Sequence, residues 1–124
     1  MARSFQDLIA WQRGMDLVVA IYEVTASFPD NEKYGLVSQM RRSAVSIPSN
    51  IAEGKMRGSE REFRRFLDIA LASAAELQTQ IFIAKKIRPT RHLDFLLCEQ
   101  LLDEALRLLF TLISNRLETE PVKS

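Results

Sequence analysis

The sequence predicts an all-α protein: an antiparallel up-down-up-down four-helix bundle that forms a single domain over residues 1–124. Apolar residues recur at spacings of three and four in four long segments, and no segment shows the strict alternation of a half-buried strand. Short connections between the segments favour antiparallel neighbours. The chain is 47% hydrophobic and 27% charged, which is ordinary for one domain with its own core.

The first helix is predicted over residues 7–27. Its apolar stripe repeats at helical spacing, and we expect it to face the core. It consists of Leu8, Trp11, Met15, Val18 and Tyr22, and it is widened by Ile9, Val19 and Ile21. The helix is expected to end near Phe28, because Pro29 disfavours helical backbone at the residue before it.

The second helix is predicted over residues 33–56, and it contains a proline. One face carries Met40, Ala44, Ile47 and Ile51. Pro48 lies on this segment and lacks the N–H that would bond the carbonyl of Ala44. Its ring also crowds that carbonyl, and together these effects destabilise a helix by roughly 3 kcal/mol. We therefore expect this helix to be kinked at Pro48, and the bend to have a structural use. The end of the helix is expected near Gly54, a residue type that suits helix termini.

The third helix is predicted over residues 59–87 and has the clearest start. Ser59 and Glu62 form a capping box, in which the serine hydroxyl accepts the N–H of residue 62. A strict four-three repeat follows, which predicts a heptad-like seam facing the core: Phe63, Leu67, Ala70, Ala74, Leu77, Ile81 and Ala84. Pro89 is expected to separate this helix from the next.

The fourth helix is predicted over residues 90–117, with Pro89 or Thr90 at its start and Asp94 in its first turn. Its apolar face is broader than one bundle core requires. One stripe holds Leu97, Leu101, Ala105, Leu108 and Leu112, and a second holds Leu102, Leu106, Leu109 and Ile113. We expect part of this surface to meet another chain, so the protein is predicted to be an oligomer.

Positive charge is concentrated in the middle of the chain. The formal net charge of the whole chain is only +1, yet residues 41–65 carry seven basic and three acidic side chains. The seven are Arg41, Arg42, Lys55, Arg57, Arg61, Arg64 and Arg65. They are either a solvated helix face or a surface that binds a polyanion, above all structured RNA or DNA, with affinity that falls steeply with salt.

Residues suited to catalysis or metal binding are sparse. A di-metal bundle site needs a Glu-x-x-His on two helices, but the only histidine, His92, follows Pro89 at that spacing. The single cysteine, Cys98, lies among leucines and excludes an internal disulfide. We therefore predict no catalytic residue, no metal and no cofactor.

The expected location is the cytoplasm, without membrane attachment. The first residues lack the apolar core of a signal peptide, and no apolar run has the length of a membrane span.

Asn50 and Glu53 stand one turn apart near Pro48. Either they satisfy backbone groups freed by the proline or pair with an arginine such as Arg42, or a partner reads them as a surface feature. If the protein were an enzyme, its active site would have to be a pocket at the subunit interface, lined by Glu53, Asn50 and Arg42.

Several motifs resemble one known family over nearly the whole chain. They are Phe5-x-x-Leu8-x-x-Trp11, Phe28-Pro29-x-x-Glu32-x-Tyr34-Gly35-Leu36, the run from Gln39 to Gly54 around Pro48, Ser59-x-x-Glu62-Phe63-x-x-Phe66-Leu67 and Glu76-Leu77-x-x-Gln80. The sequence resembles the small bacterial four-helix-bundle proteins encoded in intervening sequences of 23S rRNA genes, also labelled S23 ribosomal proteins. It departs from their frequent pattern at Lys55-Met56, where a glycine and an aromatic often stand.

The resemblance implies an antiparallel four-helix bundle that assembles as a ring-shaped homopentamer and has no enzymatic activity. Two functional hypotheses remain open. The first is a non-enzymatic oligomer that binds structured RNA or DNA through the seven basic residues. The second is a scaffold that docks another protein and does not bind nucleic acid.

Overall fold

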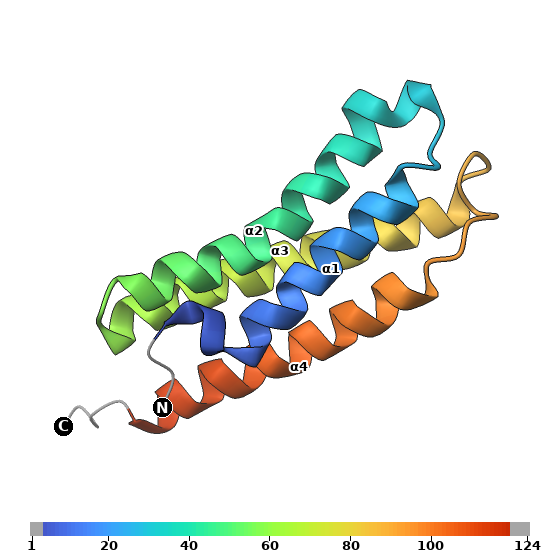
Figure 1. Ribbon diagram of the computed structural model, residues 1–124. Coiled ribbons are helices and arrows are strands. Elements are labelled where there is room, and N and C mark those ends of the chain that lie inside the picture. Colours follow the sequence, from blue (N-terminus) through green and yellow to red (C-terminus); the bar gives the residue numbers. More distant parts are fainter. Residues whose placement is uncertain (1–3, 120–124) are drawn as a thin grey trace.

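The computed structural model describes residues 4–119, and the side chains of residues 4–116. Four α-helices span most of this range: α1 (Ile9–Thr25), α2 (Ser38–Met56), α3 (Glu60–Lys86) and α4 (Leu96–Thr119). They pack as an elongated antiparallel bundle, with the α2–α3 hairpin at one end and the other two connections at the opposite end (Figure 1). No strand occurs between residues 4 and 119. The predicted fold class is confirmed.

The core is organised around α3, which packs against α2 and α4, while α1 closes the bundle between the same two helices. All seven residues of the predicted seam on α3 are buried, and so are the four on the predicted face of α2. Among the described residues, α3 is also long and apolar enough, by length and composition, to cross a membrane. That differs from the expectation drawn from the sequence, although the core helix of a bundle meets the same description.

The predicted core stripe of α1 is only partly confirmed, because Leu8, Trp11 and Val18 are half-buried against the core whereas its other two residues are exposed. The residues that α1 buries are Ala10, Gly14, Leu17, Ala20, Ile21 and Thr25. Met15 and Tyr22, which were expected in the core, are 41% and 43% exposed. The side that faces the core is rich in small residues because α1 lies close to α2: a Cβ added at Gly14 would lie 3.4 Å from Pro48 Cβ. Such a small-residue face carries a weaker apolar signal than the larger side chains beside it.

Helical backbone continues through Pro48, so α2 is one unbroken helix. A bend of its axis at Pro48 stays a prediction. The distorted backbone lies earlier, in a π-helical turn (Lys33–Val37), where Gly35 has a non-helical φ of −102° and ψ of −106°. This distortion delays the start of α2 to Ser38. The ring of Pro48 is buried and faces Gly14 on α1.

The start of α4 is later than predicted, at Leu96 instead of residue 90. Thr90 is completely buried, and its hydroxyl donates to the carbonyl of Ala84 over 2.6 Å, which holds the chain in a turn. The N–H of Leu96 then bonds the Asp94 carboxylate over 2.9 Å. Asp94 therefore acts as a cap before the helix, where it accepts an otherwise unpaired N–H, and does not lie in the first helical turn.

The start of α3 agrees with the predicted capping box, since the N–H of Glu62 donates to the Ser59 hydroxyl over 3.1 Å. The hairpin before it contains Gly58, which has a positive φ of 81°. Gly54 lies inside α2 and is needed there by packing. A Cβ at Gly54 would approach Phe66 Cβ to 2.6 Å and Phe63 Cδ1 to 3.2 Å.

We expect Gly54→Ala to destabilise the bundle by about 1–3 kcal/mol, because α2 and α3 must separate to admit the methyl group. Gly14→Ala is the matched control, since its Cβ would meet Pro48 at ordinary contact distance and alanine is the better helix former. Urea denaturation followed by circular dichroism measures both variants. A Gly54→Ala variant as stable as Gly14→Ala would contradict this account of the α2–α3 contact.

Candidate interaction surfaces

The seven basic residues predicted to bind nucleic acid do not form one surface. Arg41 and Arg42 lie in the first part of α2, and a rise of about 1.5 Å per residue places Arg42 about 20 Å from the end of the helix at Met56. The other five gather around the α2–α3 hairpin: Lys55, Arg57, Arg61, Arg64 and Arg65. The structure therefore divides the predicted site into two.

Arg41 ties α2 to α1. Its Nε donates to the hydroxyl of Thr25 over 2.9 Å, and its Nη2 donates to the carbonyl of Tyr22 over 3.3 Å. The guanidinium also lies 4.3 Å from the centre of the Tyr22 ring. These contacts use Nε and one N–H of Nη2 within the fold, which leaves Arg41 with fewer donors for a phosphate contact.

Two arginines of the hairpin stack on one aromatic ring. Arg57 and Arg65 lie 5.0 and 4.6 Å from the centre of Phe66, at distances typical of cation–π contacts. Both also pair with Glu62, Arg65 at 3.0 Å and Arg57 at 3.8 Å, and Arg57 pairs with Glu53 at 2.9 Å. We call this cluster the hairpin network (Glu53, Arg57, Glu62, Arg65 and Phe66).

The hydrogen bonds from Arg65 to Glu62 lower the pKa of the Glu62 carboxyl, and the same contact raises the pKa of Arg65. Phe63 is covered in a similar way, with Arg116 of α4 at 4.4 Å and Lys55 at 5.6 Å from its ring centre. Arg116 also pairs with Glu60 at 3.2 Å. The cations of this region thus join the ends of α2, α3 and α4.

Arg42 and Arg61 differ from the others in the predicted set. Both are exposed, and neither forms an ion pair with the residues that the structure describes. Arg64 is half-buried. The free positive charge in residues 41–65 is therefore smaller than the sequence indicated.

The polar residues near Pro48 face the seam between α2 and α3. Asn50 donates through Nδ2 to the carbonyl and the hydroxyl of Ser46, over 2.8 and 2.9 Å. The hydroxyls of Ser46 and Ser73 lie 2.8 Å apart. Glu53 pairs with Arg57 instead of turning toward Asn50. Glu53 and Asn50 thus bind different partners, which is not the arrangement of a common pocket.

Cys98 is buried, and this burial raises the pKa of its thiol to about 11. A thiol with so high a pKa is protonated at neutral pH and is a poor nucleophile. Within the described part of the chain, no three histidine, cysteine, aspartate or glutamate side chains lie together as a metal site would require.

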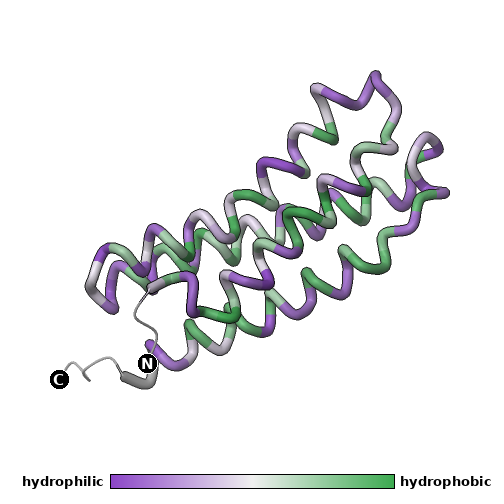
Figure 2. Tube along the Cα trace, viewed as in Figure 1, coloured by the Kyte–Doolittle hydropathy of each residue, from purple (hydrophilic) through white to green (hydrophobic). Residues whose placement is uncertain are grey.

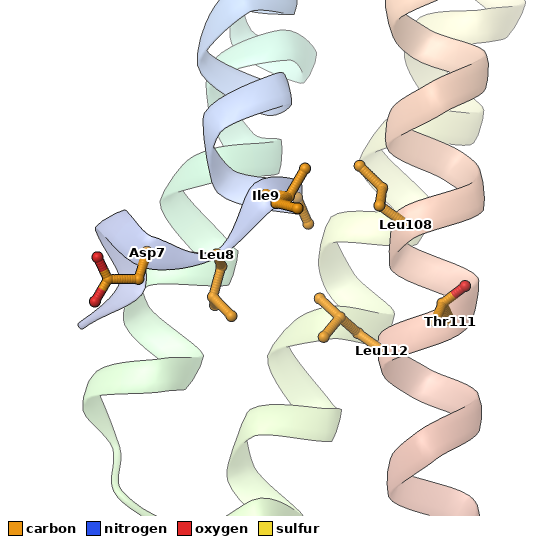
Figure 3. Close-up of a pocket in the computed structure, with 7 residues that line it drawn as sticks. Asp7, Leu8, Ile9, Leu108, Thr111 and Leu112 are labelled. Carbon is orange, nitrogen blue, oxygen red and sulfur yellow. The ribbon is translucent and has the colours of Figure 1, made fainter. Parts of the chain in front are cut away.

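A shallow apolar groove of about 300 Å³ lies between the start of α1 and the second half of α4. Leu8 and Ile9 point across it toward Leu108 and Leu112, while Asp7 points away (Figure 3). Leu97 belongs to the same side of α4 and is 55% exposed, as is Ile9. We call these five residues the α1–α4 surface (Leu8, Ile9, Leu97, Leu108 and Leu112).

The predicted stripe of α1 forms a second apolar surface, which we call the α1 stripe (Trp11, Met15, Val18, Val19 and Tyr22). Met15, Val19 and Tyr22 are exposed, and Trp11 and Val18 are half-buried. Hydrophobic segments recur along both α1 and α4 (Figure 2). The sequence contained the signal for an exposed stripe, since α1 has more large apolar residues than one core-facing side can hold, but the direction of the core could not be read from it.

The comparison with known families agrees with this architecture. A family model described as 23S rRNA-intervening sequence protein matches residues 6–111. The chain belongs to this family. No curated protein sequence matches the chain. The matched range includes α1, α2, α3 and more than half of α4.

The hairpin network of this 23S rRNA-intervening sequence protein makes its stability depend on pH. Because folding lowers the pKa of Glu62, its stabilising effect is present above the ordinary value of 4.5 and is lost as the pH falls below it. We expect Glu62→Gln to lower the melting temperature at pH 7 and to differ less from the wild type near pH 3. Thermal melts across this range measure the effect.

Asp103→Asn is the control for Glu62→Gln. It removes the same single negative charge, and Asp103 is exposed on α4. Its difference from the wild type should be small at both pH values. A Glu62→Gln deficit that stayed constant down to pH 3 would show that the carboxylate does not act through its charge.

Proposed function

We propose that this family member is a non-catalytic scaffold that assembles with copies of itself into a ring. The observation that carries the proposal is the presence of two separate, partly exposed apolar surfaces on one small bundle, the α1–α4 surface and the α1 stripe; Ile9, Leu97, Met15, Val19 and Tyr22 are their exposed members. Contiguous exposed apolar patches mark sites of protein interaction, because covering them removes apolar area from water. For the number of copies in the ring we adopt five, as the family resemblance implies.

The two surfaces differ in shape and lie on different sides of α1. The α1–α4 surface is a groove with Leu108 and Leu112 on its far wall. The α1 stripe borders α2, as the contact of Tyr22 with Arg41 shows. Two different surfaces favour a head-to-tail contact, in which the stripe of one copy covers the groove of the next. Such contacts form a ring when the rotation between copies closes, and a filament when it does not.

Nucleic-acid binding through residues 41–65 is the second candidate. The exposure of Arg42 and Arg61 favours this candidate. Three other members of the set are engaged within the fold: Arg57 and Arg65 belong to the hairpin network, and Arg41 donates to Thr25. Its test is the affinity of the Arg42→Glu/Arg61→Glu variant for a labelled RNA. Unchanged affinity would remove both residues from a nucleic-acid site.

We expect Val19→Glu and Leu97→Glu each to abolish the ring, since each places a charge on one apolar surface while leaving the monomer core intact. Both residues are more than half exposed, at 54% and 55%. Sedimentation velocity or light scattering gives the mass of each variant. Met56→Glu is the control: Met56 is 71% exposed but lies at the α2–α3 hairpin, and its variant should keep the wild-type mass.

An equal mixture of Val19→Glu and Leu97→Glu distinguishes the head-to-tail contact from a symmetric one. Each variant retains the surface that the other has lost, so the mixture should form one intact contact and a dimer mass. A mixture that stays monomeric would exclude the head-to-tail contact. A wild-type chain that is monomeric at all concentrations would overturn the proposed assembly.

A further inference from the structure

The turn between α3 and α4 carries a second basic cluster that the sequence analysis did not use. Residues 86–93 contain Lys86, Arg88 and Arg91 with no acidic residue, and His92 adds an imidazole. We call these four residues the basic turn. It lies at the end of the bundle opposite the α2–α3 hairpin (Figure 1).

Unlike the arginines of the hairpin network, the cations of the basic turn have no ion-pair partner among the described residues. All four side chains of the turn are exposed. Lys85, the neighbouring cation, is already paired with Glu99 at 2.8 Å. Three unpaired positive charges in eight residues are therefore a denser free charge than Arg42 and Arg61 supply.

The backbone of the basic turn is fixed by buried contacts. The N–H of Arg91 donates to the carbonyl of Ile87 over 2.9 Å, and Thr90 is buried with its hydroxyl on the carbonyl of Ala84. Phe95 follows the turn and packs edge-to-face on Phe28, with ring centres 6.2 Å apart. The cations thus project from a pre-formed support, which reduces the entropy lost on binding.

Acidic residues also lie near the basic turn. Asp94 caps α4 and keeps its negative charge, and Glu99 is paired with Lys85. The contact of Phe28 with Phe95 brings Asp30 and Glu32, which follow Phe28, to the same end of the bundle. The C-terminus of α3 contributes about half a negative charge through the helix dipole, which offsets part of the three cations. Near the end of α3, the carbonyls of Ile83 and Ala84 accept bonds from the N–H of Ile87 and from the hydroxyl of Thr90.

We propose that the basic turn binds the phosphate backbone of nucleic acid, through Lys86, Arg88 and Arg91 with His92 as an additional donor. Lysine and arginine supply the charge-assisted contacts that phosphate oxygens accept. The turn has no element that enters a groove, so RNA and DNA duplexes should bind with similar affinity and without sequence preference. A membrane surface fits less well, because the apolar residues of the turn, Ile87 and Leu93, are half-buried and give no anchor.

The test measures binding of the full-length chain to short labelled RNA and DNA duplexes by fluorescence anisotropy, between about 50 and 200 mM NaCl. Three phosphate contacts per copy predict a slope of about −3 in log affinity against log salt. We expect Arg88→Glu/Arg91→Glu to weaken binding at least about tenfold at the lower salt concentration. The matched control is Arg42→Glu/Arg61→Glu, which changes the charge equally and should retain the wild-type affinity within about threefold.

Each outcome decides the proposal. Equal losses in the two variants would overturn it, because net charge alone would then explain binding, and a loss confined to the control would favour the second candidate function. Absence of binding at the lowest salt concentration, or equally tight binding of poly-glutamate, would also overturn it, the latter in favour of an acidic protein partner. Circular dichroism and the solution mass confirm that both variants fold and assemble as the wild type does.

Discussion

Close packing of α2 on α3 is the constraint on which the rest of the structure depends. The seam is lined by residues too small to keep the helices apart, among them Ala44, Ala70 and Ala74, all fully buried. At the hairpin end even a methyl group at Gly54 would require the helices to shift, because its Cβ would lie only 2.6 Å from Phe66 Cβ. Phe63 and Phe66 are thereby held at the hairpin, where their rings accept the arginines and the lysine around them.

This arrangement determines which basic side chains in residues 41–65 are available to bind a partner. The sequence shows how many cations a segment holds, but their availability depends on what lies within a few ångströms. Arg57 and Arg65 share Phe66 and Glu62, and Arg41 reaches Thr25 on another helix. The last contact joins residues far apart in sequence, so no local pattern reveals it. Among the residues that the structure describes, the cations of the basic turn form no ion pair and no ring contact, although their local charge is visible in the sequence.

Apolar spacing in the sequence predicts both a helix and its buried side where that spacing coincides with the core. On α3 the four-three repeat corresponds to the buried seam, because α3 has neighbours that need a continuous apolar face. On α1 the same type of repeat indicated the buried side only in part, since Gly14 and Ala10 face the core and carry little apolar signal. The start of α4 was missed because Thr90 resembles a helix cap locally, whereas its hydroxyl is committed to Ala84. Periodicity thus identifies helices better than it identifies what each side of a helix contacts.

The two kinds of surface occupy different parts of the bundle, and this makes assembly and anion binding compatible. Helices α1 and α4, which carry the apolar surfaces, run along the bundle, whereas the basic turn lies at one end (Figure 1). In a ring with cyclic symmetry, copies related by rotation about one axis place equivalent ends on the same rim. Side-by-side packing through α1 and α4 would then bring one basic turn from every copy to that rim. A long polyanion that contacted several turns at once would gain affinity through effective concentration, so the proposed ring would bind it more tightly than a single bundle would.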